Sequence, residues 1–177
     1  MRTCTSILLA LASLLSAIPA QQTVYLIRHG EKPADDGNGL SAQGLERAQC
    51  LRNVFGASSG YNISYIIAEQ PKSSGKRTRP LLTVQPLADD LGLTVDTSCD
   101  RDDSKCVAKL VSKYDEDGSG NILICWEHDA LTNIVEALGD DDAPTYPDDS
   151  FNFIWTDPSP YSDITSVTSE MCPGLDS

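Results

Sequence analysis

Short apolar runs that end at turn residues alternate along this chain with segments whose apolar residues recur at helical spacing. The apolar runs cover residues 23–27, 65–69, 94–97 and 121–126, and the helical segments cover 40–55, 80–92, 104–114 and 130–138. This alternation is typical of a parallel sheet with helices on its faces. We therefore expect an α/β fold, a three-layer αβα sandwich with a mostly parallel central sheet. The runs 151–155 and 164–168 flank a Pro-rich turn and predict a β-hairpin or sheet edge.

The first twenty residues have the pattern of a secretory signal peptide. A basic residue precedes the apolar run 7–17, and a Pro-Ala pair ends the segment at Ala20, which suits cleavage. The run is short for a membrane span, which needs about 20 residues. We expect residues 1–20 to be removed, with an uncleaved anchor as the alternative, and 21–177 to form a single secreted domain without membrane attachment. In that pathway the sequon at Asn62 would accept glycan.

The formal net charge of the chain is -13. A surface this acidic disfavours nucleic acids and anionic membranes as partners. The acidic runs 100–103, 115–117 and 139–142 are interpreted as solvated loops rather than calcium sites. Any anion site must therefore be a local cationic pocket. No sequence feature sets the oligomeric state.

Cysteines beyond the signal segment suit the oxidising compartment that the signal implies. They are Cys50, Cys99, Cys106, Cys125 and Cys172. The odd count leaves one thiol unpaired or bridged to another molecule, and Cys125, inside an apolar run, is the best candidate for a free thiol. Cys99 and Cys106 flank a short acidic loop that a disulfide would close. Cys50 and Cys172 would then staple the C-terminus to the domain.

The chain has only two histidines, and both follow predicted strands. His29 lies in the sequence Arg28-His29-Gly30-Glu31, which ends the first strand, and His128 follows the run 121–126. The carboxyl ends of parallel strands meet at one edge of a sheet, where α/β folds bind ligands. Arg79 follows another strand and can reach the same edge. Arginine beside imidazole suits a phosphoryl group, so we expect a phosphate-binding pocket there.

These motifs resemble the histidine phosphatase superfamily, which includes phosphoglycerate mutases and histidine acid phosphatases. The resemblance covers residues 23 to about 138 and is most specific in Arg28-His29-Gly30-Glu31. It implies a phosphoglycerate mutase-like sandwich in which the first-motif histidine, here His29, is phosphorylated during turnover. Where the family shows Arg-Ala-x-Gln-Thr, this chain has Arg79-Pro80-Leu81-Leu82-Thr83. Arg79 is preferred to Arg77 as the pocket arginine because Thr83 keeps the spacing.

The expected chemistry follows from the residue types. A neutral imidazole attacks phosphorus, and neighbouring cations disfavour its protonated form, so Arg28 and Arg79 would keep His29 reactive. Their guanidinium groups bind phosphate oxygens in pairs, and His128 would donate to the charge that develops on the transferred group. This mechanism requires no cofactor and no metal, and neither histidine has cysteines at zinc-ligand spacing.

Cleavage of an ester also needs a proton for the leaving oxygen. The resemblance maps the donor of the acid phosphatase branch onto Asp129, directly after His128. Glu31 and Glu127 are alternatives by proximity alone. A competing role for Asp129 is the N-cap of the helix predicted from residue 130, where Asp is favoured.

We therefore expect a secreted phosphomonoester hydrolase that acts on a small phosphorylated substrate. The chain is shorter than phytase-type relatives with an added helical domain, so we expect an open pocket. The alternatives are a phosphomutase, a phosphatase that serves biosynthesis within the secretory system, and a non-catalytic anion-binding or interaction protein with the same fold.

Overall fold

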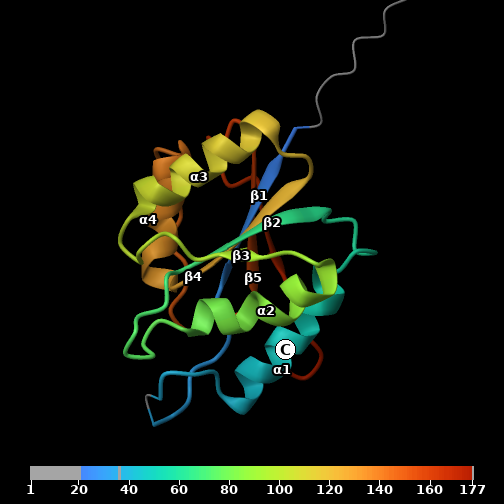
Figure 1. Ribbon diagram of the computed structural model, residues 1–177, viewed down its shortest axis with the longest axis vertical. Coiled ribbons are helices and arrows are strands. Elements are labelled where there is room, and N and C mark those ends of the chain that lie inside the picture. The colour runs from blue at the N-terminus through green and yellow to red at the C-terminus, as the bar shows by residue number, and fades with distance from the viewer. Residues whose placement is uncertain (1–20, 36, 177) are drawn as a thin grey trace, which may run out of the picture.

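The computed structural model describes residues 21–35 and 37–176 (Figure 1). The strands are β1 (Thr23–Arg28), β2 (Ile63–Ala68), β3 (Val95–Asp96), β4 (Asn121–Trp126), β5 (Phe153–Pro158) and β6 (Ser166–Ser169). The helices are α1 (Ala42–Val54), α2 (Arg79–Leu91), α3 (Ser104–Asp117) and α4 (His128–Leu138). The predicted signal peptide lies outside the described residues. Within them, no helix is both long and apolar enough to span a membrane.

The strands form one sheet in the order β3-β2-β4-β1-β5-β6. β1 to β4 run parallel to one another, whereas β5 pairs antiparallel with both β1 and β6. The expected mostly parallel sheet and the expected hairpin edge are both confirmed. β1 and β4 lie at the centre of the sheet, and this position places the residues that follow them next to each other.

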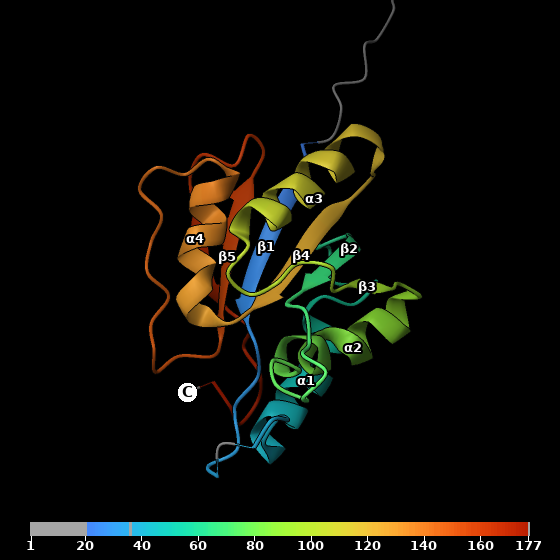
Figure 2. The same ribbon diagram turned by 60° about the vertical axis from the view of Figure 1, so that its left-hand side comes forward.

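Helices cover both faces of the sheet, so the expected αβα sandwich is confirmed. Figures 1 and 2 show α3 and α4 on one side of the strands and α1 and α2 on the other. Successive side chains of the central strands point to opposite faces of the sheet and pack into two hydrophobic cores, one on each face. From β4, Ile124 and Trp126 pack with α3 and α4, whereas Leu123 and Cys125 pack with α1 and α2. All four of these side chains are fully buried.

The helix ends largely follow the sequence signals. The Ser41 side chain caps α1 by accepting a hydrogen bond from the Gly44 N–H (3.1 Å). α2 stops at Gly92, whose φ of 68° lies in the left-handed region that glycine adopts without strain. The competing role of Asp129 as the N-cap of this helix is wrong: α4 begins at His128, and Glu127 occupies the cap position. Asp129 lies in the first helical turn instead, where its negative charge interacts favourably with the helix dipole.

The disulfides expected from the sequence are present. Cys50 in α1 is bonded to Cys172 near the C-terminus, and Cys99 is bonded to Cys106 across the acidic loop before α3. Cys125 is a free, buried thiol in β4. The first bond fastens the C-terminal segment onto α1.

Buried ion pairs strengthen the same attachment. The Arg47 side chain of α1 is only 2% exposed and contacts the carboxylates of Glu31 (2.7 Å), Glu170 and Asp176 (3.0 Å). Glu31 therefore belongs to a structural charge cluster. It links the segment after β1, helix α1 and the C-terminus, which holds the chain beyond His29 in place.

Candidate active site

The carboxyl ends of β1, β4 and β2 meet at one edge of the sheet. Arg28, the last residue of β1, lies opposite Trp126, the last residue of β4. The His29 N–H continues this ladder by donating to the Trp126 carbonyl (3.0 Å). β2 pairs with the other side of β4, so Glu69, the residue after β2, reaches the same edge. The prediction that both histidines follow the carboxyl ends of parallel strands is confirmed, and the two strands are neighbours.

Gly30 lets the turn after His29 pack closely against helix α1. A Cβ atom at this position would lie 3.0 Å from the carbonyl oxygen of Gly44 and 3.1 Å from its Cα, and neither backbone atom can move aside easily. The Gly30 N–H donates to the Thr83 hydroxyl of α2 (2.8 Å). The glycine of the motif thus lets the start of α1 and the first turns of α2 pack against the turn that follows His29.

His29 has the environment of a neutral nucleophile. His29 is only 4% exposed, and its Nδ1 lies 2.7 Å from the Gly30 carbonyl oxygen. A carbonyl only accepts hydrogen bonds, so Nδ1 carries the proton and Nε2 keeps the lone pair. Burial lowers the pKa of His29 to about 4; the Gly30 carbonyl opposes this effect, and the charges of Arg28 and Arg79 add to it. The imidazole therefore stays neutral over most of the acidic range.

A cavity of about 260 Å³ opens beside His29. Its lining is strongly polar and consists of His29, Glu69, Arg77, Arg79, Pro80, Arg101 and Glu127. Three guanidinium groups around one imidazole match the local cationic pocket expected in this acidic chain. The predicted residues His29 and Arg79 and the alternative Glu127 line the cavity, whereas Arg28, His128, Asp129 and Glu31 do not.

Arg79 is held by backbone carbonyls. Its Nε donates to Gly39 (3.0 Å) and its Nη2 to Gly37 (2.6 Å). Arg77 also lines the cavity, where it pairs with Asp100 (2.8 Å) and lies 3.5 Å from Glu69. The choice between the two arginines made from the sequence was therefore unnecessary, since both reach the cavity.

Arg28 faces the loop before β5. Its Nη1 donates to the carbonyls of Asp148 (2.7 Å) and Ser150 (2.8 Å), and its guanidinium carbon lies 3.8 Å from the centre of the Phe151 ring. A buried guanidinium needs acceptors, and this loop supplies them. Its Nε is buried without a hydrogen-bond partner among the described residues, so one donor of the group remains unused.

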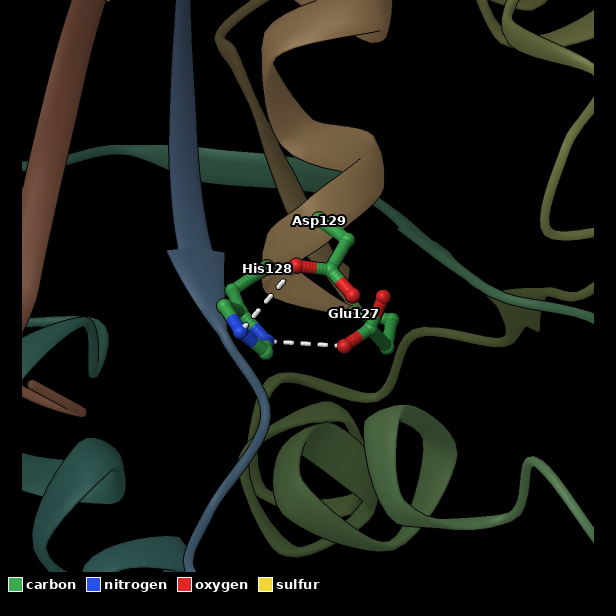
Figure 3. A group of neighbouring side chains, drawn as sticks. All are labelled: Glu127, His128 and Asp129. Atoms are coloured by element: carbon green, nitrogen blue, oxygen red, sulfur yellow. Dashed lines mark ion pairs between the residues drawn. The ribbon is translucent and has the colours of Figure 1, made fainter. Parts of the chain in front are cut away.

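His128 lies among carboxylates at the start of α4 (Figure 3). Its Nε2 is 3.3 Å from both Asp129 and Asp148. Its Nδ1 is 2.7 Å from Glu127 Oε1, although these atoms are not aligned for a hydrogen bond. The possible ligand atoms of Glu127, His128 and Asp129 lie within 4.8 Å of one another, a spacing that could hold a metal ion and that no sequence pattern indicates.

The candidate acids occupy different environments. Asp129, the first choice from the sequence, has a side chain that is 61% exposed and contacts His128. Glu127 Oε2 accepts hydrogen bonds from Arg101 Nη2 (2.8 Å) and Nε (3.2 Å). Glu31 is committed to Arg47. None of the three is a buried carboxyl free of close ion pairs.

Two cavity residues, Glu69 and Arg101, are not predicted from the sequence. Glu69 directly follows β2, and the rule that singles out His29, a polar residue at the carboxyl end of a strand, applies to it equally. It is instead interpreted from the sequence as the last residue of that strand. Arg101 lies in the loop after β3, within a run interpreted as a solvated acidic loop. Its contact with Glu127 brings it to the cavity, and no local sequence signal indicates this.

Comparisons with known proteins extend this picture. No protein-family model and no curated protein sequence matches the chain. Among solved structures, the protein histidine phosphatase SixA complexed with tungstate superposes with a TM-score of 0.63 at 15% identity, covering 84% of this chain and 97% of SixA. A phosphoserine phosphatase from Entamoeba histolytica gives 0.56 at 15% identity, covering 86% and 99%. A phosphoglycerate mutase from Bacillus anthracis gives 0.55 at 14% identity, covering 84% and 91%.

These proteins share the sandwich, and each is covered almost entirely. At such low identity the likeness concerns the fold, and the site residues rest on the geometry described above. The chain has a phosphoglycerate mutase-like fold, which it shares with SixA, the phosphoserine phosphatase and the mutase.

Proposed function

We propose that this protein is a phosphomonoester hydrolase that forms a phosphohistidine intermediate at His29. The observation that carries the proposal is the state of His29, which is buried and neutral, with its Nδ1 proton directed at the Gly30 carbonyl. Nε2 is then the nitrogen available to attack phosphorus. The cavity beside it is lined by arginines that suit a phosphoryl group. The fold shared with phosphatases supports the same reading.

The arginines have distinct roles in this proposal. Arg79, held by two backbone carbonyls, presents a preorganised cation to the phosphate oxygens. Arg28 contributes its charge next to His29, while the loop before β5 holds its guanidinium group. Arg77 and Arg101 complete a positive lining. His128 would donate to the transferred group once the side chain turns from its carboxylate neighbours.

Water then cleaves the phosphohistidine and releases inorganic phosphate. The first step must also supply a proton to the leaving oxygen. Asp129 is the donor by family resemblance, and Glu127 and Glu31 are the alternatives by proximity. The high exposure of Asp129, and its position outside the cavity lining, weaken its case.

We propose a secreted location for the enzyme. The disulfides favour an oxidising compartment. Asn62 of the sequon is exposed, as glycan attachment requires. The N-terminal pattern of residues 1–20 points the same way.

Phosphate release measures the proposed activity directly. Protein beginning at residue 21 is incubated with p-nitrophenyl phosphate and a panel of aliphatic phosphate esters between acidic and neutral pH. We expect turnover by the wild type and none above background by His29→Ala, while Arg79→Ala raises KM and lowers kcat. Absence of His29-dependent release from every substrate would favour the non-catalytic anion-binding alternative.

A further inference from the structure

Glu69 is a buried acid in the cavity that contains His29. It follows β2 directly, its side chain is 2% exposed, and it shares the cavity lining with His29 and Arg79. Its Oε1 has no hydrogen-bond partner among the described residues. The nearest cation is Arg77, whose Nε lies 3.5 Å away and is also close to the carboxylate of Asp100 through its Nη1. A polar group this deeply buried and this weakly paired calls for an explanation.

Burial keeps the carboxyl group of Glu69 protonated at acidic pH. Burial raises the pKa of Glu69 to about 7; Arg77 and Arg101 oppose the shift, while Glu127 and Asp100 add to it. These groups come from the loop before α2, the loop after β3 and the residue that follows β4. The neutral acid presents an O–H donor to the cavity.

The other candidate acids at this edge of the sheet, Glu127 and Asp129, are not both buried in the cavity and weakly paired. Glu127 lines the cavity but receives two hydrogen bonds from Arg101. Asp129 is 61% exposed and contacts His128 rather than the cavity. Of the two acidic side chains that line the described cavity, Glu69 is the more weakly paired, because its ion pair with Arg77 is 3.5 Å long whereas that of Glu127 with Arg101 is 2.8 Å.

We propose that Glu69 is the general acid of the reaction at His29, and that the site is therefore built for phosphate esters of aliphatic alcohols. This inference rests on the phosphatase function proposed above, and in it Glu69 takes the place of Asp129 as the proton donor. An aliphatic alcohol leaves as a high-energy alkoxide unless it is protonated, so a positioned acid matters most for this class of ester.

The two half-reactions balance with water as the only co-reactant. In the first, a bond forms between His29 Nε2 and phosphorus and the ester O–P bond breaks. Its electron pair goes to the leaving oxygen, which takes the Glu69 proton, and the alcohol departs. In the second, a water oxygen bonds to phosphorus while its proton passes to the Glu69 carboxylate. The N–P electron pair returns to Nε2, and inorganic phosphate leaves.

The closing experiment compares two substrates that differ in their need for acid. Glycerol 2-phosphate has an aliphatic leaving group, whereas p-nitrophenyl phosphate releases a stable anion. We expect Glu69→Gln to lower kcat/KM for glycerol 2-phosphate by roughly 100-fold or more, the usual contribution of general acid catalysis. The loss for p-nitrophenyl phosphate should be much smaller. Glu127→Gln, the same chemical change in the same cavity, and Asp129→Asn should alter both substrates by a common factor.

Other outcomes separate the possible failures. Equal losses on both substrates for Glu69→Gln would mean that Glu69 only supports the structure and would overturn the proposal. A selective loss on glycerol 2-phosphate for Asp129→Asn, with Glu69→Gln retaining the wild-type substrate ratio, would assign the acid to Asp129. Absence of His29-dependent turnover of both substrates would contradict the phosphatase function itself and the role of Glu69 with it.

A measurement on the wild type covers the case in which Glu69→Gln does not fold. The ratio of kcat/KM for glycerol 2-phosphate to that for p-nitrophenyl phosphate is recorded from pH 5 to pH 9. Each value is first corrected for the ionisation of its own substrate, because an alkyl phosphate loses its second proton at higher pH than an aryl phosphate. The ratio should fall as pH rises through about 7, because Glu69 loses its proton there. A ratio that does not vary with pH would contradict general acid catalysis by Glu69.

Discussion

The hydroxyl group of Thr83 connects the turn after His29 to Arg79, the pocket arginine at the start of α2. It accepts a hydrogen bond from the Gly30 N–H (2.8 Å) and donates one to the Arg79 carbonyl (2.8 Å). Thr83 is fully buried. One side chain of α2 therefore fixes the spacing between the nucleophile and Arg79.

Replacement of Thr83 by Val tests this coupling. The side chain keeps its shape but leaves the buried Gly30 N–H without a partner, which costs about 1–3 kcal/mol. We expect the free energy of unfolding in urea to fall by that amount and kcat/KM to fall at least tenfold. Thr83→Ser keeps the hydroxyl and should retain most of the activity. If Thr83→Val were as active as the wild type, the two motifs would be positioned independently of this contact.

The pKa of His29 predicts the acidic limit of activity. The folded imidazole gains its proton only near pH 4. Protonation of His29 should therefore not lower kcat/KM for p-nitrophenyl phosphate until the pH falls to about that value. The unfolded imidazole binds its proton near pH 6.5. Between these values the unfolded state holds more protons, so His29 makes the fold less stable as the pH falls. An NMR titration of the His29 ring with a midpoint near 6.5 would contradict the buried, neutral nucleophile.

Asp157 predicts the opposite trend in stability. This buried residue of β5 has no hydrogen-bond partner for either carboxylate oxygen, and burial, with Asp140 and Asp163 nearby, raises its pKa to about 7. The folded carboxyl thus holds a proton up to about pH 7, whereas the unfolded one loses it near 3.8. The stability that this proton confers is complete below the unfolded pKa and is lost as the pH rises through 7.

Asp157→Asn isolates this contribution. The amide cannot ionise, so the variant should be more stable than the wild type at pH 8, by at least about 1 kcal/mol, and should lose less stability between pH 5 and pH 8. Thermal unfolding at several pH values measures both effects. An identical pH dependence in the two proteins would mean that Asp157 titrates normally.

The disulfides should differ in their contributions to stability. Cys50 and Cys172 are separated by 122 residues, and Cys99 and Cys106 by 7. The entropy of loop closure predicts losses of about 5 and about 2 kcal/mol when each pair is replaced by alanines. Denaturant unfolding of the two double variants checks the order. A larger loss for the short loop would show that the C-terminal attachment depends on the Arg47 ion pairs rather than on the covalent bond.

Much of the fold follows from local sequence patterns. The buried runs 23–27 and 121–126, which precede His29 and His128, are continuous and apolar, so their strand character does not depend on distant contacts. Ser41 and Gly92 mark helix ends by their own backbone chemistry. The cysteine pairs could be inferred because the apolar run around Cys125 removed one thiol from the choice.

The cavity was only partly predictable, because long-range contacts decide where charged side chains point. Arg28 follows the strand as expected, but carbonyls of the loop before β5 hold its guanidinium. Glu31 is drawn to Arg47, and Arg101 is brought in by Glu127. Glu69 was missed because a charged residue at the end of an apolar run was interpreted as part of the strand. No local pattern encodes these partners.

The covalent intermediate at His29 is the central claim of this account. Wild-type protein, mixed with p-nitrophenyl phosphate and quenched in alkali, which preserves phosphohistidine, is digested and analysed by mass spectrometry in parallel with His29→Ala. We predict one added phosphoryl group that is lost in acid and maps to His29, and none in the variant. Substrate turnover by the wild type without phosphate on His29 at any quench time, or with the same label in His29→Ala, would contradict the mechanism.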